Sequence, residues 1–193
     1  MSTPRSPFQK YAIFKVVILL LLAIDAAIYA VGDVPSAALD AIAWLTLLLL
    51  FEWETVLKGR WRGNWLTAAI HAARIAAIVG IGLAAIAFFE ERAWLDAMNT
   101  ALWIGVVAML ELEVRFPQWV ARWPGLFFAL SLLLYGALAL LVLAWAWHGE
   151  WLDAYDALIW IIAFAIIEMD VLRFSRNSAS ELASAPSESA APQ

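Results

Sequence analysis

Hydrophobic residues in this chain form six long blocks, which are separated by short segments rich in charged and turn-forming residues. Each block has about 20 residues, the length at which an α-helix crosses a hydrocarbon layer roughly 30 Å thick. The pattern therefore predicts an all-α membrane protein with six transmembrane helices. The approximate blocks are Phe8–Val31, Ala37–Leu57, Trp65–Phe89, Leu95–Arg115, Pro124–Trp147 and Leu152–Phe174.

Polar residues and tryptophans within the even-numbered blocks repeat in a fixed frame: Asp or Asn, three residues, Trp, seven residues, Glu, one residue, Glu or Asp. The tryptophan of the frame is Trp44, then Trp103 at 59 residues further, then Trp160 at 57 residues further. A repeat of this period indicates a unit of two helices. We predict three antiparallel two-helix hairpins over residues 8–57, 65–115 and 124–174, an arrangement compatible with a pseudo-threefold bundle. Residues 1–7 would form a cytoplasmic N-terminal arm, and residues 175–193 a disordered cytoplasmic tail.

Connections that contain lysine or arginine alternate with connections that are mainly acidic. The cations precede the first block, fill the second and fourth connections and follow the sixth block, at Arg5, Lys10, Lys58, Arg60, Arg62, Arg115, Arg122, Arg173 and Arg176. The other connections are mainly acidic, for example Glu90–Asp96. Because Lys and Arg are enriched on the cytoplasmic side of membrane proteins, this alternation predicts cytoplasmic N and C termini. We expect an integral protein of the inner (plasma) membrane, with the lipid bilayer as its surroundings.

The composition excludes several classes of function. Hydrophobic residues make up 65% of the 193 residues, and 12 are tryptophans, but none is a cysteine, so disulfides and thiolate chemistry are ruled out. A net charge of −5 argues against a nucleic-acid partner. No HExxH, GxSxG, P-loop or GxGxxG motif occurs, and the two histidines are expected on opposite sides of the membrane. We therefore expect neither an enzyme nor a cofactor.

The acids at the carboxyl end of the repeat frame are the candidate site. A carboxylate within a membrane is costly and usually faces the protein interior or a polar pathway, and the helix dipole disfavours it near a helix C-terminus. Possible partners recur on the preceding helices at the same spacing, as Lys15, Arg74 and Ser131. We predict an inner ring of Glu52, Glu111 and Glu168, with the second acids of the frame beside it. These second acids are Glu54, Glu113 and Asp170.

The third copy of the frame differs from the other two in its partner. Ser131 stands where the first two copies have Lys15 and Arg74, so Glu168 and Asp170 lack a matched cation. Glu168 is therefore the expected functional acid, with Ser131 as a hydrogen-bond donor. The acids and amide that open the frame are interpreted instead as capping residues in the first turns of their helices. These are Asp40, Asn99 and Asp156.

Two classes of function fit these observations. One is a small proton or cation transporter or channel that uses the carboxylate ring near the cytoplasmic face; the sequence leaves the ion, and whether it is a metal, open. The other is a non-catalytic accessory or scaffold subunit with a membrane-protein partner or a second copy of itself. A stripe of small residues, able to contact another helix closely, supports the second: Ala68, Ala72, Ala76, Gly80 and Ala84. A charged cavity would favour transport, whereas a solid core with a flat apolar face would favour the subunit.

Overall fold

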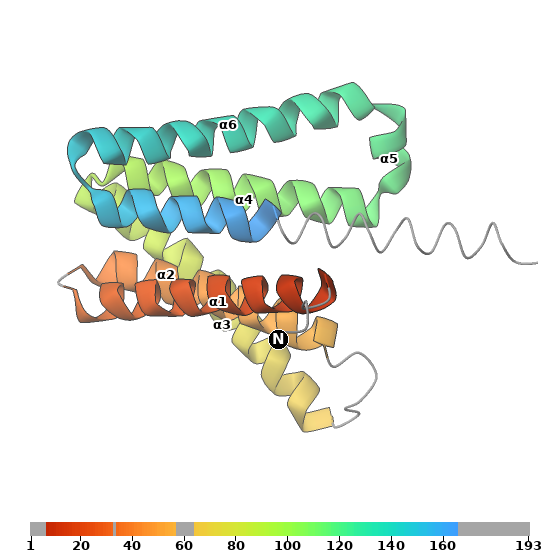
Figure 1. Ribbon diagram of the computed structural model, residues 1–193, viewed down its shortest axis with the longest axis horizontal. Helices are drawn as coiled ribbons and strands as arrows, with labels where there is room; N and C mark the ends of the chain where they lie inside the picture. The colour runs from red at the N-terminus through yellow and green to blue at the C-terminus, as the bar shows by residue number, and fades with distance from the viewer. Residues whose placement is uncertain (1–6, 33, 57–63, 166–193) are drawn as a thin grey trace, which may run out of the picture.

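The structure, a computed structural model, describes residues 7–32, 34–56 and 64–165, and these residues form helices joined by short turns (Figure 1). The helices are α1 (Pro7–Val31), α2 (Pro35–Val56), α3 (Asn64–Glu91), α4 (Trp94–Arg115), α5 (Pro117–Arg122) and α6 (Pro124–His148). A further helix covers residues 151–165 and is called helix 151–165 below. Proline begins α2, α5 and α6, a position where its missing N–H and fixed φ cost nothing.

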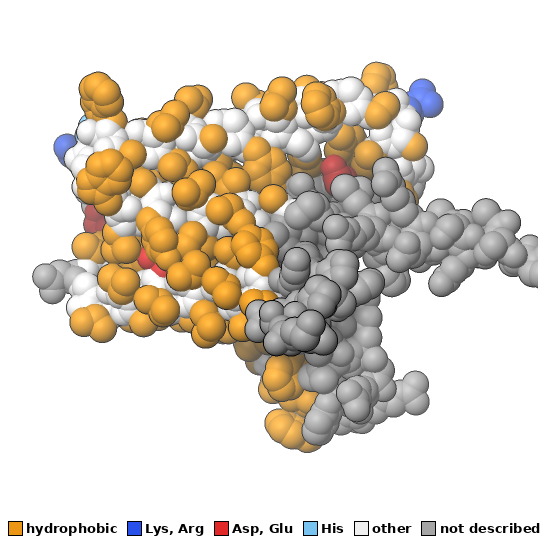
Figure 2. Space-filling view, in the orientation of Figure 1, with side chains coloured by type: hydrophobic (Ala, Val, Ile, Leu, Met, Phe, Trp, Pro, Cys, Tyr) orange, Lys and Arg blue, Asp and Glu red, His pale blue; other side chains and the backbone are white. Residues whose placement is uncertain are grey.

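Five of the described helices, α1, α2, α3, α4 and α6, are long and apolar enough to cross a membrane. The prediction of an all-helical fold is therefore confirmed, and the long apolar helices fit the predicted membrane protein. Figure 2 shows a largely hydrophobic surface over the helices. The sixth predicted segment, Leu152–Phe174, begins in helix 151–165, but its second half lies outside the described residues. The N-terminal arm, apart from Pro7, and the tail predicted for residues 175–193 lie outside them too.

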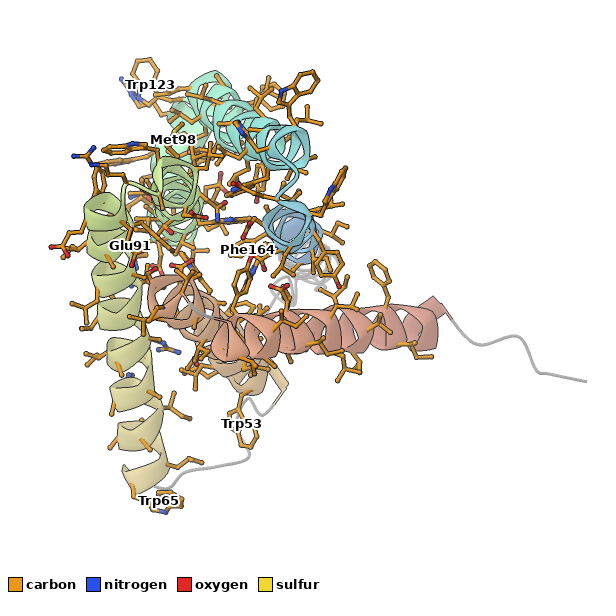
Figure 3. The ribbon with its side chains drawn as sticks, turned by 90° about the vertical axis from the view of Figure 1, so that its left-hand side faces the viewer. Trp53, Trp65, Glu91, Met98, Trp123 and Phe164 are labelled. Carbon is orange, nitrogen blue, oxygen red and sulfur yellow. The ribbon has the colours of Figure 1, made fainter. Side chains whose placement is uncertain are left out.

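Helices that follow one another along the chain pack against each other: α1 on α2, α2 on α3, α3 on α4, and α4 on α6. The helices do not all run in one direction. In Figure 3, α4, α6 and helix 151–165 are seen nearly end-on, whereas α1 and α3 run across the view. The Glu91 end of α3 lies near Met98 of α4, and its Trp65 end lies far from that helix. The helices therefore come together at one end of the molecule.

The small-residue stripe of α3 is packed over only half of its length. Gly80 and Ala84 are buried, and a Cβ at Gly80 would lie 3.3 Å from the Cβ of Ala43 on α2. Ala68, Ala72 and Ala76 are exposed. The stripe thus contacts a neighbouring helix over its second half and is exposed over its first half, where α3 diverges from its neighbours.

The two turns that leave α3 and α6 have the same conformation. Arg92 and Gly149 each have a left-handed backbone, with φ of 59° and 82°. The next amide in each turn donates to a carbonyl five residues earlier, from Ala93 to Phe88 and from Glu150 to Trp145, at 2.9 Å in both cases. This is the Schellman arrangement, which satisfies the last carbonyls of a helix. We call the end of the molecule that carries these turns the turn end.

Aromatic rings occupy the middle of the core. The ring of Trp160 lies 6.4 Å from that of Trp44 and 6.3 Å from that of Trp103. Phe164 stacks beside them, 4.7 Å from Trp103. We call these four side chains the aromatic layer. Buried aliphatic residues from several helices surround it: Ile18, Leu22, Leu48, Ile81, Val106, Leu138 and Ile159.

Candidate functional site

A cavity of about 30 Å³ lies between the aromatic layer and the turn end. Its volume is enough for about two water molecules, given that one water needs roughly 10–15 Å³ on this measure. Figure 3 looks onto this end of the molecule and shows side-chain oxygens among the helices around its centre. The lining residues are Tyr29, Ala37, Asp40, Ala41, Trp44, Phe88, Asp96, Asn99, Trp103, Trp145, Asp153, Asp156 and Trp160.

All but one of the lining residues fall into four sets of three, in which the second residue follows the first by 59 positions and the third follows by 57. The sets are Tyr29, Phe88 and Trp145; Ala37, Asp96 and Asp153; Asp40, Asn99 and Asp156; and Trp44, Trp103 and Trp160. Positions separated by three, four and seven residues share one face of a helix. The cavity is therefore enclosed by corresponding faces of α2, α4 and helix 151–165, and by the last turns of α1, α3 and α6.

Two hydrogen bonds hold polar side chains at the cavity. The Tyr29 hydroxyl of α1 donates to Oδ1 of Asp153 at 2.5 Å, which links the first and last described helices. The Thr100 hydroxyl of α4 donates to Oδ1 of Asp40 on α2 at 3.3 Å. Both donors are neutral hydroxyl groups. They orient the two carboxylates, but they do not neutralise them.

Several buried polar atoms near the cavity meet no hydrogen-bond partner among the described residues. They are both carboxyl oxygens of Asp25, Oδ1 of Asn99, Oδ1 of Asp156, and the indole Nε1 of Trp44 and Trp103. A buried polar atom left without a partner costs about 1–3 kcal/mol, so such atoms usually contact water or a ligand. The arrangement therefore favours a hydrated cavity.

Acidic side chains at this cavity have no matching cation. Within residues 7–32, 34–56 and 64–165, no ion pair involves Asp25, Asp40, Asp96, Asp153 or Asp156. The same part of the chain contains no group of three or more His, Cys, Asp or Glu side chains placed to hold a metal ion. The site has the charge to attract protons or small cations, without a ready-made set of metal ligands.

The acids near the other end are paired with cations. Lys15 Nζ lies 2.7 Å from a carboxyl oxygen of Glu52, and Arg74 Nη2 lies 2.8 Å from one of Glu54. Both cations thus lie opposite acids of α2. The repeat register matched Lys15 to this helix, but it matched Arg74 to the acids of its own hairpin, Glu111 and Glu113, and Arg74 pairs with the preceding repeat instead. Glu111 forms an ion pair with Arg115, one turn later on its own helix. The repeat spacing did not predict Arg115 as the partner of this acid.

The remaining predicted site residues are located less completely. Glu168 and Asp170 lie outside the described residues. Ser131 is half-buried on α6, and Glu113 is half-buried on α4. The ion-binding role assigned to the inner acids therefore stays a prediction.

The capping interpretation of the first residues of the frame is wrong for all three. Asp40, Asn99 and Asp156 are each the sixth residue of their helices, α2, α4 and helix 151–165, so they stand beyond the positions that cap a helix. The residue before α4 is Ala93, and no side chain caps that helix. The shared register of Asp40, Asn99 and Asp156 was the signal that could have placed them at one site, since equivalent positions in a repeat meet around a common axis.

Comparisons of the chain with protein-family models, with curated proteins and with solved structures found no match. The geometry of the cavity and of the ion pairs is therefore the basis of the functional argument.

Proposed function

We propose that this membrane protein binds protons or small cations in the acid-lined cavity and carries them across the bilayer. The observation that carries the proposal is the set of carboxylates around the cavity, which have no paired cation among the described residues. Carboxylates within membrane segments that face a polar space commonly mark an ion or proton pathway. The inner acids Glu52, Glu111 and Glu168 would lie along the remainder of the path.

The proposed architecture is six spans in three repeated hairpins around a pseudo-threefold axis. Two observations support it. The lining residues recur at intervals of 59 and 57 positions. The turns at Arg92 and Gly149, which are 57 residues apart, have the same pattern of hydrogen bonds. In this arrangement the three frame tryptophans lie close to the axis, which would explain why their rings meet.

The proposed orientation places the turn end outside and the Lys15–Glu52 pair near the cytoplasm. The alternation of cations along the sequence supports this orientation. The aromatic layer lies between the cavity and the ion pairs, so the conformation described here would be open to one side only. A transported ion would require the helices to rearrange around Trp44, Trp103 and Trp160, as gating of a site within a helical bundle does.

An accessory or scaffold subunit is the second candidate. It is favoured by one observation, the exposed small side chains of Ala68, Ala72 and Ala76 on α3, which would let a partner helix approach closely. A scaffold needs no charged interior, however, and uncompensated buried carboxylates destabilise a protein that does not use them. The cavity therefore favours transport.

Flux measurements on purified protein in liposomes test this proposal. A pH-sensitive dye, or a sodium- or potassium-sensitive one, is enclosed in the vesicles, and flux is followed after a potential is imposed. The test variant is Asp40→Asn, because Asn99 already occupies the same register in α4 and an amide there is compatible with helix packing. The control is Glu90→Gln, an exposed carboxylate near the end of α3.

We expect wild-type protein to give flux above that of empty liposomes, Asp40→Asn to reduce it at least fivefold, and Glu90→Gln to leave it unchanged. A reduction of this size corresponds to about 1 kcal/mol in the barrier. Flux equal to that of empty liposomes with protons, sodium and potassium would transfer support to the accessory subunit.

A further inference from the structure

We propose that Asp25 of α1 and Asp156 of helix 151–165 form a carboxyl pair that binds a single proton between them. This inference deepens the proposed function and rests on it for the role of that proton in transport. The existence of the pair itself depends only on the packing of the two helices. Asp25 was not singled out by the repeat frame, and Asp156 had been interpreted as a capping residue.

The register of the two helices brings the carboxyl groups together. The Tyr29 hydroxyl bonds to Asp153, so these two residues mark one level along the contact between α1 and helix 151–165. Asp25 lies one turn before Tyr29, about 6 Å along α1, and Asp156 lies about 4.5 Å beyond Asp153. The two helices cross at an angle, but the chain runs toward the turn end in α1 and away from it in helix 151–165, so both steps lead away from the turn end (Figure 1). The two carboxyl groups are accordingly within hydrogen-bonding reach of each other.

The pair is buried without the groups that two ionised carboxylates would need. Asp25 is only 1% exposed, and neither of its oxygens meets a donor among the described residues. Two carboxylates are both acceptors and repel each other, whereas one proton turns one of them into a donor and creates a strong hydrogen bond. A shared proton thus removes the repulsion and satisfies the buried oxygens together, as in other carboxyl pairs that share a site.

The surroundings of the pair contain acids and a phenol, but no base among the described residues. The groups that face it are Tyr29 on α1, Asp153 on helix 151–165 and Asp40 on α2. The described lysine and arginine that sequence analysis matched to acids, Lys15 and Arg74, are already paired with other carboxylates of α2.

The position of each acid relative to the cavity defines a path for this proton. Asp156 lines the cavity and Asp25 does not. A proton from cavity water would reach Asp156 first and then be shared with the more deeply buried Asp25. Among the described residues, no third His, Cys, Asp or Glu joins the pair in a group that could hold a metal ion.

Asp25 makes the surroundings of the cavity asymmetric. The positions 59 and 116 residues further along are Ala84 and Leu141, and both are buried and apolar. Each copy of the frame contains one residue of the set Asp40, Asn99 and Asp156. Among the described residues, a buried carboxyl lies next to the third of them, Asp156, and not at the equivalent positions Ala84 and Leu141. The structure thus offers one such proton site per molecule rather than three.

Infrared spectroscopy of the purified protein in lipid tests the pair directly. A protonated carboxyl group gives a carbonyl stretching band that is distinct from the bands of carboxylates and shifts in D₂O. We expect wild-type protein at neutral pH to show such a band. Asp25→Asn and Asp156→Asn should each lose it. In each variant the amide N–H₂ group of the asparagine can donate a hydrogen bond to the remaining carboxylate, which then no longer needs a shared proton. Glu90→Gln serves as the control and should retain the band.

The outcomes separate this inference from the proposed function. A band that persists in both Asn variants, or a wild-type protein without one, would overturn the shared proton even if flux is observed. A band that both variants lose, in a protein that moves no proton or cation in liposomes, would support the pair and overturn transport. If one variant fails to elute as a folded, monodisperse protein, the other and the wild-type spectrum decide the result.

Discussion

At the scale of single residues, the two ion pairs at α2 have different surroundings. The Lys15 and Glu52 side chains are 24% and 11% exposed, whereas those of Arg74 and Glu54 are 34% and 44% exposed. Removing one member of a buried pair leaves an uncompensated charge in a medium of low dielectric constant. Removing one member of a more exposed pair allows the remaining charge to be solvated. The first pair should therefore be the more sensitive to mutation.

Lys15→Met is expected to lower the free energy of unfolding by about 3 kcal/mol, and Arg74→Ala by about 1 kcal/mol or less. The double variant Lys15→Met with Glu52→Gln should recover most of the loss, because it removes both charges. Thermal unfolding in one detergent, followed by circular dichroism, measures all three. Equal losses for the two single variants would contradict the assignment of the Lys15–Glu52 pair to the interior.

Residues could be matched from the sequence where they repeat. The spacing of Lys15 and Arg74 equals that of the frame tryptophans, so the register alone was enough to match Lys15 to the acids of α2. It matched Arg74 to the acids of α4, whereas Arg74 pairs with Glu54 of α2, because α3 packs against α2. Asp25 has no polar counterpart at Ala84 or Leu141, and no periodic pattern distinguishes it from a residue at a helix end. Its burial depends on which helix packs over it, and that is a property of the folded molecule.

At the scale of elements, the turns after α3 and α6 place different residues in one backbone conformation. Both turns have a left-handed residue, which is Gly149 after α6 and Arg92 after α3. Glycine adopts this conformation freely, whereas a residue with a Cβ pays about 1–2 kcal/mol for it. The α3–α4 turn therefore carries a strain that the other turn lacks.

Opposite changes at these two turns should have opposite effects. Gly149→Ala is expected to destabilise the protein by about 1 kcal/mol even though a Cβ there would meet no atom within 4 Å, because the cost comes from the backbone. Arg92→Gly should raise the free energy of unfolding by a few tenths of a kcal/mol, after the greater entropy of glycine in the unfolded chain offsets part of the gain. Unfolding in detergent provides the measurement. A stabilising Gly149→Ala would show that the turn relaxes to another conformation.

Helix boundaries were predictable because apolar blocks and proline positions are local. The predicted segments Leu95–Arg115 and Pro124–Trp147 differ from α4 and α6 by only one residue at one end. The short connection between them contains the helix α5. The direction of each helix could not be predicted from the sequence. The divergence of α3 from its neighbours arises from packing between helices, which the hydrophobic pattern does not describe.

At the scale of the whole molecule, the helices converge where their turns lie, and this convergence encloses the cavity. From the sequence alone, the inner acids were the more conspicuous, because a carboxylate near a helix C-terminus is opposed by the helix dipole. When each helix is considered alone, the helix dipole does not oppose the acids at the turn end. Only the assembly of α1, α2, α4 and helix 151–165 brings Asp40, Asp96 and Asp156 around one space without cations among the described residues.

The orientation of the molecule can be measured with single cysteines, since the natural chain contains none. Cysteine in place of Arg92 or Glu150, in two different turns at the turn end, should react in intact cells with a thiol reagent that cannot cross membranes. Cysteine in place of Gln118, on α5 at the other end, should react only after the cells are opened. The reverse pattern would place the cavity on the cytoplasmic side.

The aromatic layer also has an electrical consequence. Water in the cavity would keep the electric potential there equal to that of the adjacent solution as far as Trp44, Trp103 and Trp160. The voltage across the membrane would therefore fall mainly over these rings and the aliphatic side chains beyond them. One elementary charge that crosses this layer of side chains then gains or loses about 2.3 kcal/mol of electrostatic energy per 100 mV. The membrane voltage would thus act on the short step past the tryptophans rather than on diffusion through the cavity.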